Sequence, residues 1–541
     1  MSTPYITTSK RLVHNTIFNV ITLVSGAAIG FFLIRFCLVH LGEAKYGLWV
    51  LIGSIFQYRR LLDMGMNSSI NRYIPVGLAK DDQDGIQRIL STSFFFFSVL
   101  AVVLALVCLI IYQHIGAWFA IAGDIVGVAG VLVLIVGFCF AVAMPLQPSS
   151  ALLSGLQRYD ILNLAELLFL VLRTALLIIL LRRGYGLLTM GLLFGISEIL
   201  VRLVQFIWAR KLLPHSSITL RSIDFKLLRA MLAYGINTFL YTVGAIIICK
   251  ASDVVIGIFI GTAQISQFAV AVAGVLLLSQ LLYAFTAAIK PAISDLDARD
   301  EHARVREISF LMQKYSLLLI IPAACFLIVM GREFLQVWVG EKFQEPGMID
   351  SMSAMLSILT VGHCLRLAQH SNFIVLVGKG EHRLFGLLTV ATALLCILAS
   401  IVSIKVFHLG LLAIAWSNCL PMALVSGIVL PIYFNRKMKI AIRESLLRIW
   451  WPALLGSAPS VVAIAIWSYL SPPDSWPEIL AVVAVAVLLT FTAGCFFSLT
   501  QLERKTFLRI LAPGLLARTE QLTAQRARNG RIGELVTKRT G

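Results

Sequence analysis

The sequence predicts an all-α, polytopic membrane protein with about 14 transmembrane helices. Of its 541 residues, 59% are hydrophobic and only 13% are charged, whereas about 25% are charged in an average soluble protein. The apolar runs are long and recur along the whole chain, and about 20 apolar residues suffice for one crossing. A transmembrane β-barrel is excluded, because its strands alternate polar and apolar residues over about ten positions.

The apolar runs define the expected spans in order. The first begins at Leu12 and is too long for the core of a signal peptide, so we interpret it as a retained span. The spans are expected at residues 12–34, 46–71, 89–112, 124–146, 161–181, 188–208, 230–249, 264–289, 308–329, 351–377, 384–404, 409–433, 449–470 and 478–499.

Basic residues indicate how these spans are oriented. An even number of spans places both termini on one side, and most of the 45 Lys and Arg residues fall in the termini and loops of that side. By the positive-inside rule this side is the cytoplasm. The same bias accounts for the net charge of +18, so that nucleic acid is not required as a partner.

The two halves of the chain resemble each other at an offset of about 220 residues. Trp118 aligns with Trp338, for example, and Gly186 with Gly410. Six spans in each copy give both copies the same orientation, and transporters commonly bind cargo between two such halves. The expected division is an N-lobe (1–209), a cytoplasmic linker (210–229), a C-lobe (230–435), two additional spans (436–500) and a basic cytoplasmic tail (501–541).

The second span carries Arg59, Arg60 and Asp63 near its middle. A charge at the bilayer centre costs at least about 3 kcal/mol, so these residues are expected to face a wet cavity or a partner. In one interpretation Asp63 neutralises the arginines locally, from three and four residues away. Because one carboxylate cannot neutralise two guanidinium groups, the other interpretation is a cationic patch that meets an anionic cargo.

Spans five and six carry further charges at membrane depth. Glu166 and Arg173 are seven residues apart in span five and therefore share one face of the helix. Glu198 and Arg202 form an i, i+4 pair in span six, which can neutralise itself. We interpret the second pair as structural.

Span ten carries a polar stripe made of His363, Arg366 and His370, at i, i+3 and i+7. Interhelical hydrogen bonds would explain the stripe without any function. Because histidine titrates in the physiological range, the stripe could instead couple a proton to movement. Both interpretations stay open.

These four spans together hold more arginines than carboxylates, so their core is cationic before any histidine protonates. A cationic cavity selects anions, and the guanidinium fork matches phosphate oxygens. The sequence therefore predicts an anionic cargo, with the cavity cations Arg59, Arg60, Arg173 and Arg366 and with the charge or coupling partners Asp63, Glu166, His363 and His370.

Motifs of catalytic or metal sites are not found in the sequence. There is no GxxxxGK[ST] loop for ATP and no HExxH helix for zinc, and the nine cysteines are scattered singly, with no CxxC pair. The expected external loops are too short for the domain of a membrane glycosyltransferase. A transporter without metal or organic cofactor is expected, and a proton or sodium ion remains open as the coupling ion.

Three stretches identify a family resemblance: LGEAKYGLW (41–49), LLDMGMNSSINRYIP (61–75) and DVVIGIFIG (253–261). They resemble the Wzx-type polysaccharide-export flippases of the multidrug/oligosaccharidyl-lipid/polysaccharide superfamily. The resemblance implies two six-helix lobes around a cavity that opens alternately to either side of the bacterial inner membrane. The implied cargo is an oligosaccharide on undecaprenyl pyrophosphate, for surface polysaccharides such as lipopolysaccharide or exopolysaccharide. Membrane lipid and the polymerase and chain-length machinery are the expected partners.

Two departures from the family pattern keep alternatives open. Many members have twelve spans, whereas fourteen, as expected here, are typical of the lipid II flippases of the same superfamily. The multidrug antiporters carry carboxylates in their cavity, but span one offers only Asn15 and Asn19, and span seven is expected to be equally bare. A non-transporting scaffold for glycan assembly is the alternative from a different class of protein.

Overall fold

The structure is a computed structural model that describes residues 8–214, 218–287, 293, 296–297, 299–381, 383–499 and 503. Every regular element in this part of the chain is a helix, and 13 helices are long and apolar enough to cross a membrane. The expected all-α, polytopic fold is thereby confirmed. The basic tail expected at 501–541 lies outside the described residues, except for Glu503.

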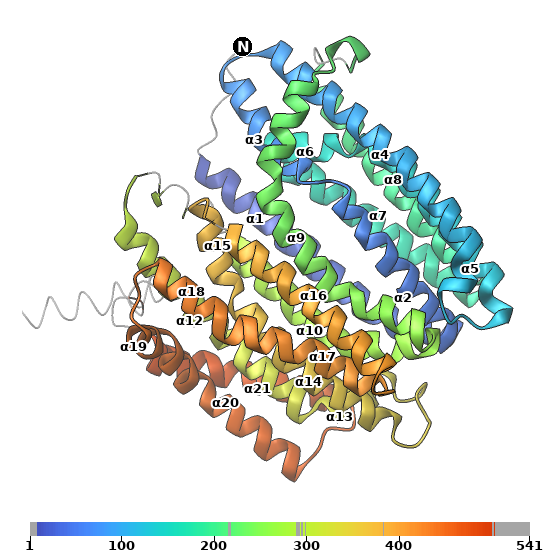
Figure 1. The fold of residues 1–541 in the computed structure, drawn as a ribbon. Coiled ribbons are helices and arrows are strands. Elements are labelled where there is room, and N and C mark those ends of the chain that lie inside the picture. Colours follow the sequence, from blue (N-terminus) through green and yellow to red (C-terminus); the bar gives the residue numbers. More distant parts are fainter. Residues whose placement is uncertain are drawn as a thin grey trace, which may run out of the picture.

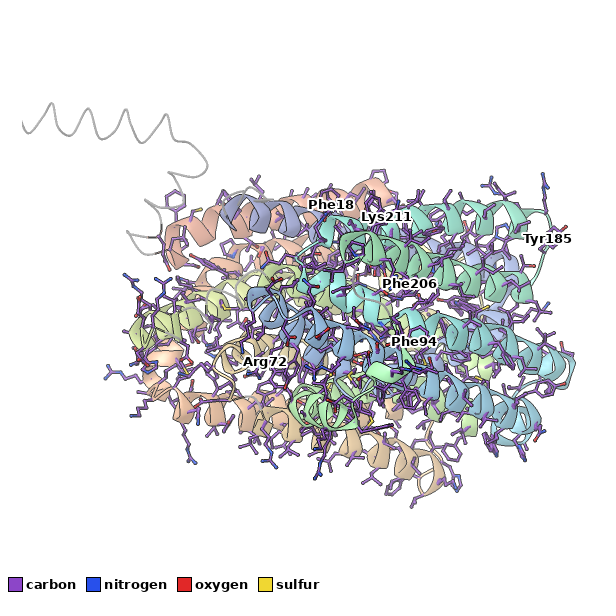
Figure 2. The ribbon with its side chains drawn as sticks, turned by 90° about the horizontal axis from the view of Figure 1, so that it is seen from above. Phe18, Arg72, Phe94, Tyr185, Phe206 and Lys211 are labelled. Carbon is purple, nitrogen blue, oxygen red and sulfur yellow. The ribbon has the colours of Figure 1, made fainter. Side chains whose placement is uncertain are left out.

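The N-terminal half of the chain, as named here, comprises the helices as far as α8. They are α1 (Thr8–Leu41), α2 (Glu43–Gln57), η1 (Tyr58–Leu61), α3 (Met66–Ala79), α4 (Gln83–Trp118), α5 (Gly123–Ala143), η2 (Met144–Leu146), α6 (Pro148–Gly155), α7 (Tyr159–Arg182) and α8 (Leu187–Leu212). In this half α5 packs against α4 and α8, and α7 packs against α1 and α8. Tyr185 in the α7–α8 turn and Lys211 near the end of α8 lie far apart along the bundle (Figure 2).

The C-terminal half comprises the remaining helices, after the short η3 (Leu220–Ser222). They are α9 (Phe225–Phe259), α10 (Thr262–Ala287), α12 (His302–Val329), α13 (Gly331–Val339), α14 (Met348–Ala368), α15 (His370–Gly378), α16 (Arg383–Lys405), α17 (Leu411–Leu424), η4 (Val425–Val429), α18 (Leu430–Lys437), α19 (Ile442–Ser445), η5 (Leu446–Trp450), α20 (Trp451–Leu470), α21 (Trp476–Ala493) and η6 (Gly494–Ser498). Here α9 packs against α16, α14 against α10 and α17, and α20 against α12 and α21.

The two halves form two groups of helices, and α9 runs between them (Figure 1). The start of α9 lies at the end of the bundle that holds the α3–α4 turn. There Asp224 caps the helix, and hydrogen bonds from the backbone N–H groups of Leu227 and Lys226 lower the pKa of its carboxyl. The opposite end holds the α1–α2 turn.

The second expected span is not one continuous helix. It is broken between α2 and α3 by the 3₁₀ turn η1 and by Gly65, which has a φ of 80°. A positive φ ends a right-handed helix and is readily adopted by glycine. The α3 helix restarts at once, because the carboxylate of Asp63 accepts a hydrogen bond from the backbone N–H of Asn67 at 3.1 Å. The break corrects the expected helix 46–71 and places Arg59 and Arg60 on η1.

The halves meet through backbone contacts at both ends of the bundle. At the α1–α2 end, a Cβ on Gly47 would lie 1.7 Å from the carbonyl oxygen of Thr262. At the α3–α4 end, Gly65 and Gly235 touch, so that a Cβ on Gly65 would lie 2.4 Å from the oxygen of Gly235. Glycine permits this approach because it has no side chain. The two contacts join the halves at opposite ends of the bundle.

Candidate functional site

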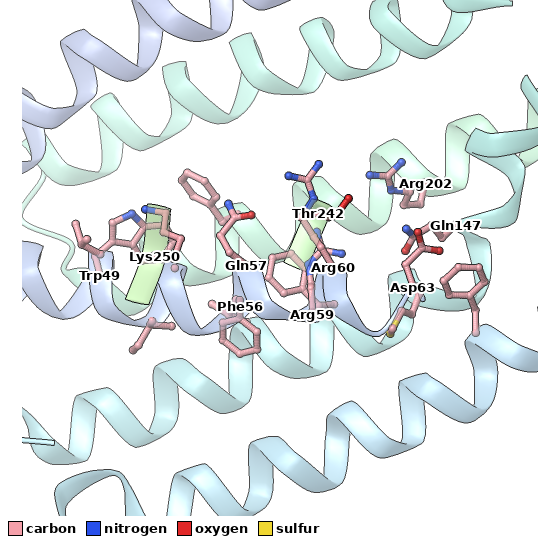
Figure 3. A pocket seen from close by; sticks show the side chains of 18 of the residues that line it. Trp49, Phe56, Gln57, Arg59, Arg60, Asp63, Gln147, Arg202, Thr242 and Lys250 are labelled. Atoms are coloured by element: carbon pink, nitrogen blue, oxygen red, sulfur yellow. The ribbon is translucent and has the colours of Figure 1, made fainter. Parts of the chain in front are cut away.

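A cavity of about 690 Å³ lies between these two contacts, within the usual range for ligand sites of about 300–1,000 Å³. Its walls come from α2, η1 and the start of α3, from α4, α5 and α8, and from α9 of the other half. Figure 3 shows Trp49 and Lys250 near one end, Arg59, Arg60 and Thr242 in the middle, and Asp63, Gln147 and Arg202 near the other end. We call this space the central cavity.

Two of the central cavity's arginines share one carboxylate. Arg59 and Arg202 both approach Oε1 of Glu198, at 3.4 and 3.1 Å. Arg59 also lies flat over the ring of Phe140, with its Cζ 4.1 Å from the ring centroid. The expected i, i+4 pair in α8 is present, but Glu198 neutralises only one of its two cationic neighbours. This cluster therefore keeps a net positive charge.

Arg60 is exposed to the central cavity and has no hydrogen bond or ion pair with any described residue. The carboxylate of Asp63 does not pair with it, because that carboxylate caps α3 through Asn67. Within the described part of the chain, Asp63 therefore makes no ion pair with either arginine, although its charge lies near Arg60. A free guanidinium in a wet cavity can bind a phosphate through two parallel hydrogen bonds.

The other end of the central cavity carries a buried charge pair on α9. Asp253 is only 3% exposed and accepts hydrogen bonds from Ser54 of α2 at 2.7 Å and from Lys250 at 3.3 Å. This corrects the expected end of span seven at residue 249, since α9 continues to Phe259. The apolar residues around Asp253 continue the span, and the two hydrogen bonds satisfy its carboxylate there.

Removing this carboxylate tests its role in holding the halves together. We expect Asp253→Asn to lower the free energy of unfolding by about 2 kcal/mol, because Lys250 loses its charged partner. Thermal unfolding of the purified protein in detergent measures the change. The double variant Lys250→Met/Asp253→Asn serves as the control and should recover part of the loss. Equal stability of Asp253→Asn and the wild type would contradict the assignment.

Arg173 and Glu166, both on α7, lie outside the lining of the central cavity. Arg173 stacks on Phe194, with its Cζ 3.8 Å from the ring centroid, and the Phe194 ring forms part of the cavity wall. Phe194 in turn meets Trp49 edge to face at 4.7 Å. Arg173 therefore packs against the wall residue Phe194 without lining the central cavity itself. Glu166 is exposed and has no ion pair among the described residues.

The stripe of span ten lies elsewhere in the molecule. His363 and Arg366 are buried on α14, and His370 begins α15. Arg366 and His370 line a small separate cavity inside the C-terminal half. The structure thus brings Arg59 and Arg60 together and places Arg366 apart from them.

Two lining cations were not among the expected site residues. Arg202 was interpreted as self-neutralised within its helix, and only the tertiary contact with Arg59 shows that Glu198 is shared. Lys250 lies one residue beyond the expected span 230–249. The apolar run 254–260, which begins four residues after it, is the signal that could have extended the span. With them, four cations and the single carboxylate of Asp63 line the central cavity within the described ranges.

Residues 41–346 of the chain match the family described as "Polysaccharide biosynthesis protein". A search of curated protein sequences finds no match. The matched segment contains the central cavity's η1 arginines, Arg202 of α8 and Lys250 of α9.

Solved structures share the fold at low sequence identity. The lipid II flippase MurJ in an inward closed conformation superposes with a TM-score of 0.66 and 16% identity, over 89% of this chain and 98% of that one. An inward-facing multidrug resistance MATE family transporter of the MOP superfamily superposes with a TM-score of 0.61 and 15% identity, over 78% of this chain and 98% of that one. A MOP superfamily transporter from Pyrococcus furiosus superposes with a TM-score of 0.60 and 16% identity, over 80% of this chain and 96% of that one.

Proposed function

Because the chain belongs to the polysaccharide biosynthesis protein family and has the fold of the MOP superfamily transporters, we propose that it is a lipid-linked oligosaccharide flippase. Its cargo would be an oligosaccharide on undecaprenyl pyrophosphate, and alternating access would move it from the cytoplasmic to the periplasmic leaflet of the inner membrane. This transport would serve surface polysaccharide synthesis.

The observation that carries the proposal is the charge of the central cavity. Arg60 has no partner among the described residues, and Arg59 and Arg202 share one carboxylate. A pyrophosphate offers several anionic oxygens, and each guanidinium can bind two of them. The aromatic wall formed by Trp49 and Phe194 gives the attached sugars an apolar face to lie against.

A second cavity supports a lipid anchor on this cargo. A groove of about 740 Å³ runs between α1, α10, α12 and α21, and its lining is almost entirely apolar. Leu480 and Val487 on α21 are more than 60% exposed there, which is the expected state of side chains that face hydrocarbon. A polyprenyl chain could lie in this groove while its head group occupies the central cavity.

The charge bias of the loops assigns each end of the bundle to one side of the membrane. With the basic loops in the cytoplasm, the α3–α4 end is the cytoplasmic end and the α1–α2 end is periplasmic. The Gly65–Gly235 contact would then close the cytoplasmic side, and the Gly47–Thr262 contact the periplasmic side. Alternating access requires that only one of the two contacts opens at a time.

Lipid II remains the second candidate cargo, because the likeness to the lipid II flippase MurJ extends over 89% of this chain. Its pyrophosphate would suit the same arginines. A cation-coupled multidrug antiporter is less well supported. The structure does place a carboxylate on the seventh span, but Asp253 is already occupied by Lys250 and Ser54.

Deletion of the gene in its native host tests the proposed cargo. We expect a complete pyrophosphate-linked repeat to accumulate while the surface polymer disappears, because synthesis continues on the cytoplasmic side without export. Mass spectrometry of lipid extracts and a surface-polysaccharide assay measure both. Accumulation of lipid II would favour the second cargo. Unchanged lipid pools with normal surface polymer would contradict both cargoes. Raised sensitivity to cationic drugs in the same strain would then favour an antiporter.

A further inference from the structure

The C-terminal half encloses the small cavity around Arg366. It has a volume of about 20 Å³ and is lined by Tyr241 of α9, Arg366, His370, Thr389 and Thr392 of α16, and Ser426 of η4. A hollow of this size holds at least one water, and a monatomic ion is of similar size.

Arg366 carries a charge in this cavity that no described carboxylate compensates. Its side chain is 9% exposed, and its one hydrogen bond to a described residue is the long contact of Nη2 with the hydroxyl of Tyr283, at 3.3 Å. Its Nε–H has no partner among the described residues. An unpaired buried charge costs several kcal/mol, and removing a partner from a buried pair costs as much. The guanidinium of Arg366 therefore lacks a negative partner among the described residues.

The carboxylates of the surrounding helices are engaged elsewhere. Among the described elements that line the cavity, α9 holds Asp253 and α14 holds Asp350. Asp253 pairs with Lys250, and Asp350 pairs with Arg332 at 2.5 Å. Neither is free to neutralise Arg366.

Among the described residues, two hydroxyls around the cavity are free to donate hydrogen bonds into it. The hydroxyls of Tyr241 and Ser426 can both donate, and Nδ1 of His370 is buried without a partner among the described residues. The hydroxyls of Thr389 and Thr392 already donate to backbone carbonyl oxygens, each at 2.8 Å. The guanidinium of Arg366 and the hydroxyls of Tyr241 and Ser426, with no carboxylate on the described lining, suit an anion, and Arg366 would repel a metal cation.

We propose that Arg366, His370, Tyr241 and Ser426 hold one small monovalent anion of the halide class inside the C-terminal half. In the cell this anion would be chloride. It would complete the charge balance of Arg366 and tie together α9, α14, α15 and η4. The proposal concerns a site apart from the central cavity and does not depend on the cargo.

Thermal unfolding of the full-length protein in detergent tests the proposal. At equal ionic strength, the unfolding temperature should be higher in sodium chloride or bromide than in sodium gluconate, because a halide, unlike the much larger gluconate, enters the cavity and binds the folded state. The variant Arg366→Gln should lose this difference. It should be at least as stable as the wild type in gluconate, where the wild type carries an uncompensated charge, and less stable than the wild type in chloride.

A second variant guards against misfolding of Arg366→Gln. Tyr241→Phe combined with Ser426→Ala keeps the packing and the arginine but removes two donors, so halide dependence should shift to concentrations at least about tenfold higher. Crystals grown in bromide should show an anomalous peak beside Arg366. A peak confined to the central cavity would overturn the proposal. So would equal unfolding temperatures in chloride and gluconate, which would mean that water alone fills the site.

Discussion

The double variant Arg59→Gln/Arg60→Gln is expected to lose export by at least 100-fold at normal membrane levels. Arg60 makes no ion pair with any described residue, and Arg59 shares Glu198 with Arg202. Charged hydrogen bonds are each worth about 1.5–3 kcal/mol, so that the loss of two guanidinium groups removes most of the affinity for a pyrophosphate. Export is measured as surface polymer in a deletion strain that carries the variant, with lipid-linked precursor quantified in the same cells.

The matched control removes two other arginine charges, at an exposed turn that does not line the central cavity. Arg182 and Arg183 are exposed at the α7–α8 turn, and Arg182→Gln/Arg183→Gln should export normally. Normal export by the η1 double variant would show that the central cavity does not recognise its cargo through these arginines. An equal loss of export in both double variants would mean that the net charge of the protein or its insertion into the membrane is affected, and not the binding of cargo.

Gly47→Ala is expected to reduce export almost as severely while the protein still reaches the membrane. The added Cβ would lie 1.7 Å from the oxygen of Thr262 and 2.7 Å from its carbonyl carbon. Both are backbone atoms and cannot rotate away, so α2 and α10 must separate at the α1–α2 end. Overpacking of this kind typically costs about 1–3 kcal/mol, and here the whole cost falls on the closed state of that end. The export assay and an immunoblot of membranes measure the effect.

Gly30→Ala provides the comparison for this prediction. It makes the same chemical change inside α1, where a Cβ would meet nothing within 4 Å. Its export and its membrane level should match the wild type, because alanine also favours a helix slightly over glycine. If Gly47→Ala exported as well as Gly30→Ala, the Gly47–Thr262 contact would not be part of the transport cycle.

Much of the fold followed from composition and periodicity. Runs of about 20 apolar residues can satisfy their backbone in a membrane only as helices, so the all-α, multi-pass architecture was predictable and is confirmed. Two departures from the expected spans bear on the site, and both are local. Gly65 breaks the second span, and α9 carries Lys250 and Asp253 beyond the expected end of span seven. In both places polar residues within a span form hydrogen bonds with other residues, and a hydropathy pattern cannot show such contacts.

The candidate site was predictable only in part. Arg59 and Arg60 stood out because charges at membrane depth require a cavity or a partner, and they do line the central cavity. That Glu198 would serve Arg59, 139 residues away, could not be inferred from the i, i+4 spacing of Glu198 and Arg202. The sequence also could not show that the carboxylate of Asp63 accepts a hydrogen bond from the first turn of α3 instead of pairing with the neighbouring arginines.

The sequence by itself determined that this protein spans the membrane many times and that charges must be sheltered inside it. Only the tertiary structure decided which charges meet. It gathers Arg59, Arg60, Arg202 and Lys250 around one cavity and encloses Arg366 in another. The physical reason is that burial of apolar surface depends on local pattern, whereas the energy of a charge depends on its distance to every other charge, and those distances exist only once the helices have packed.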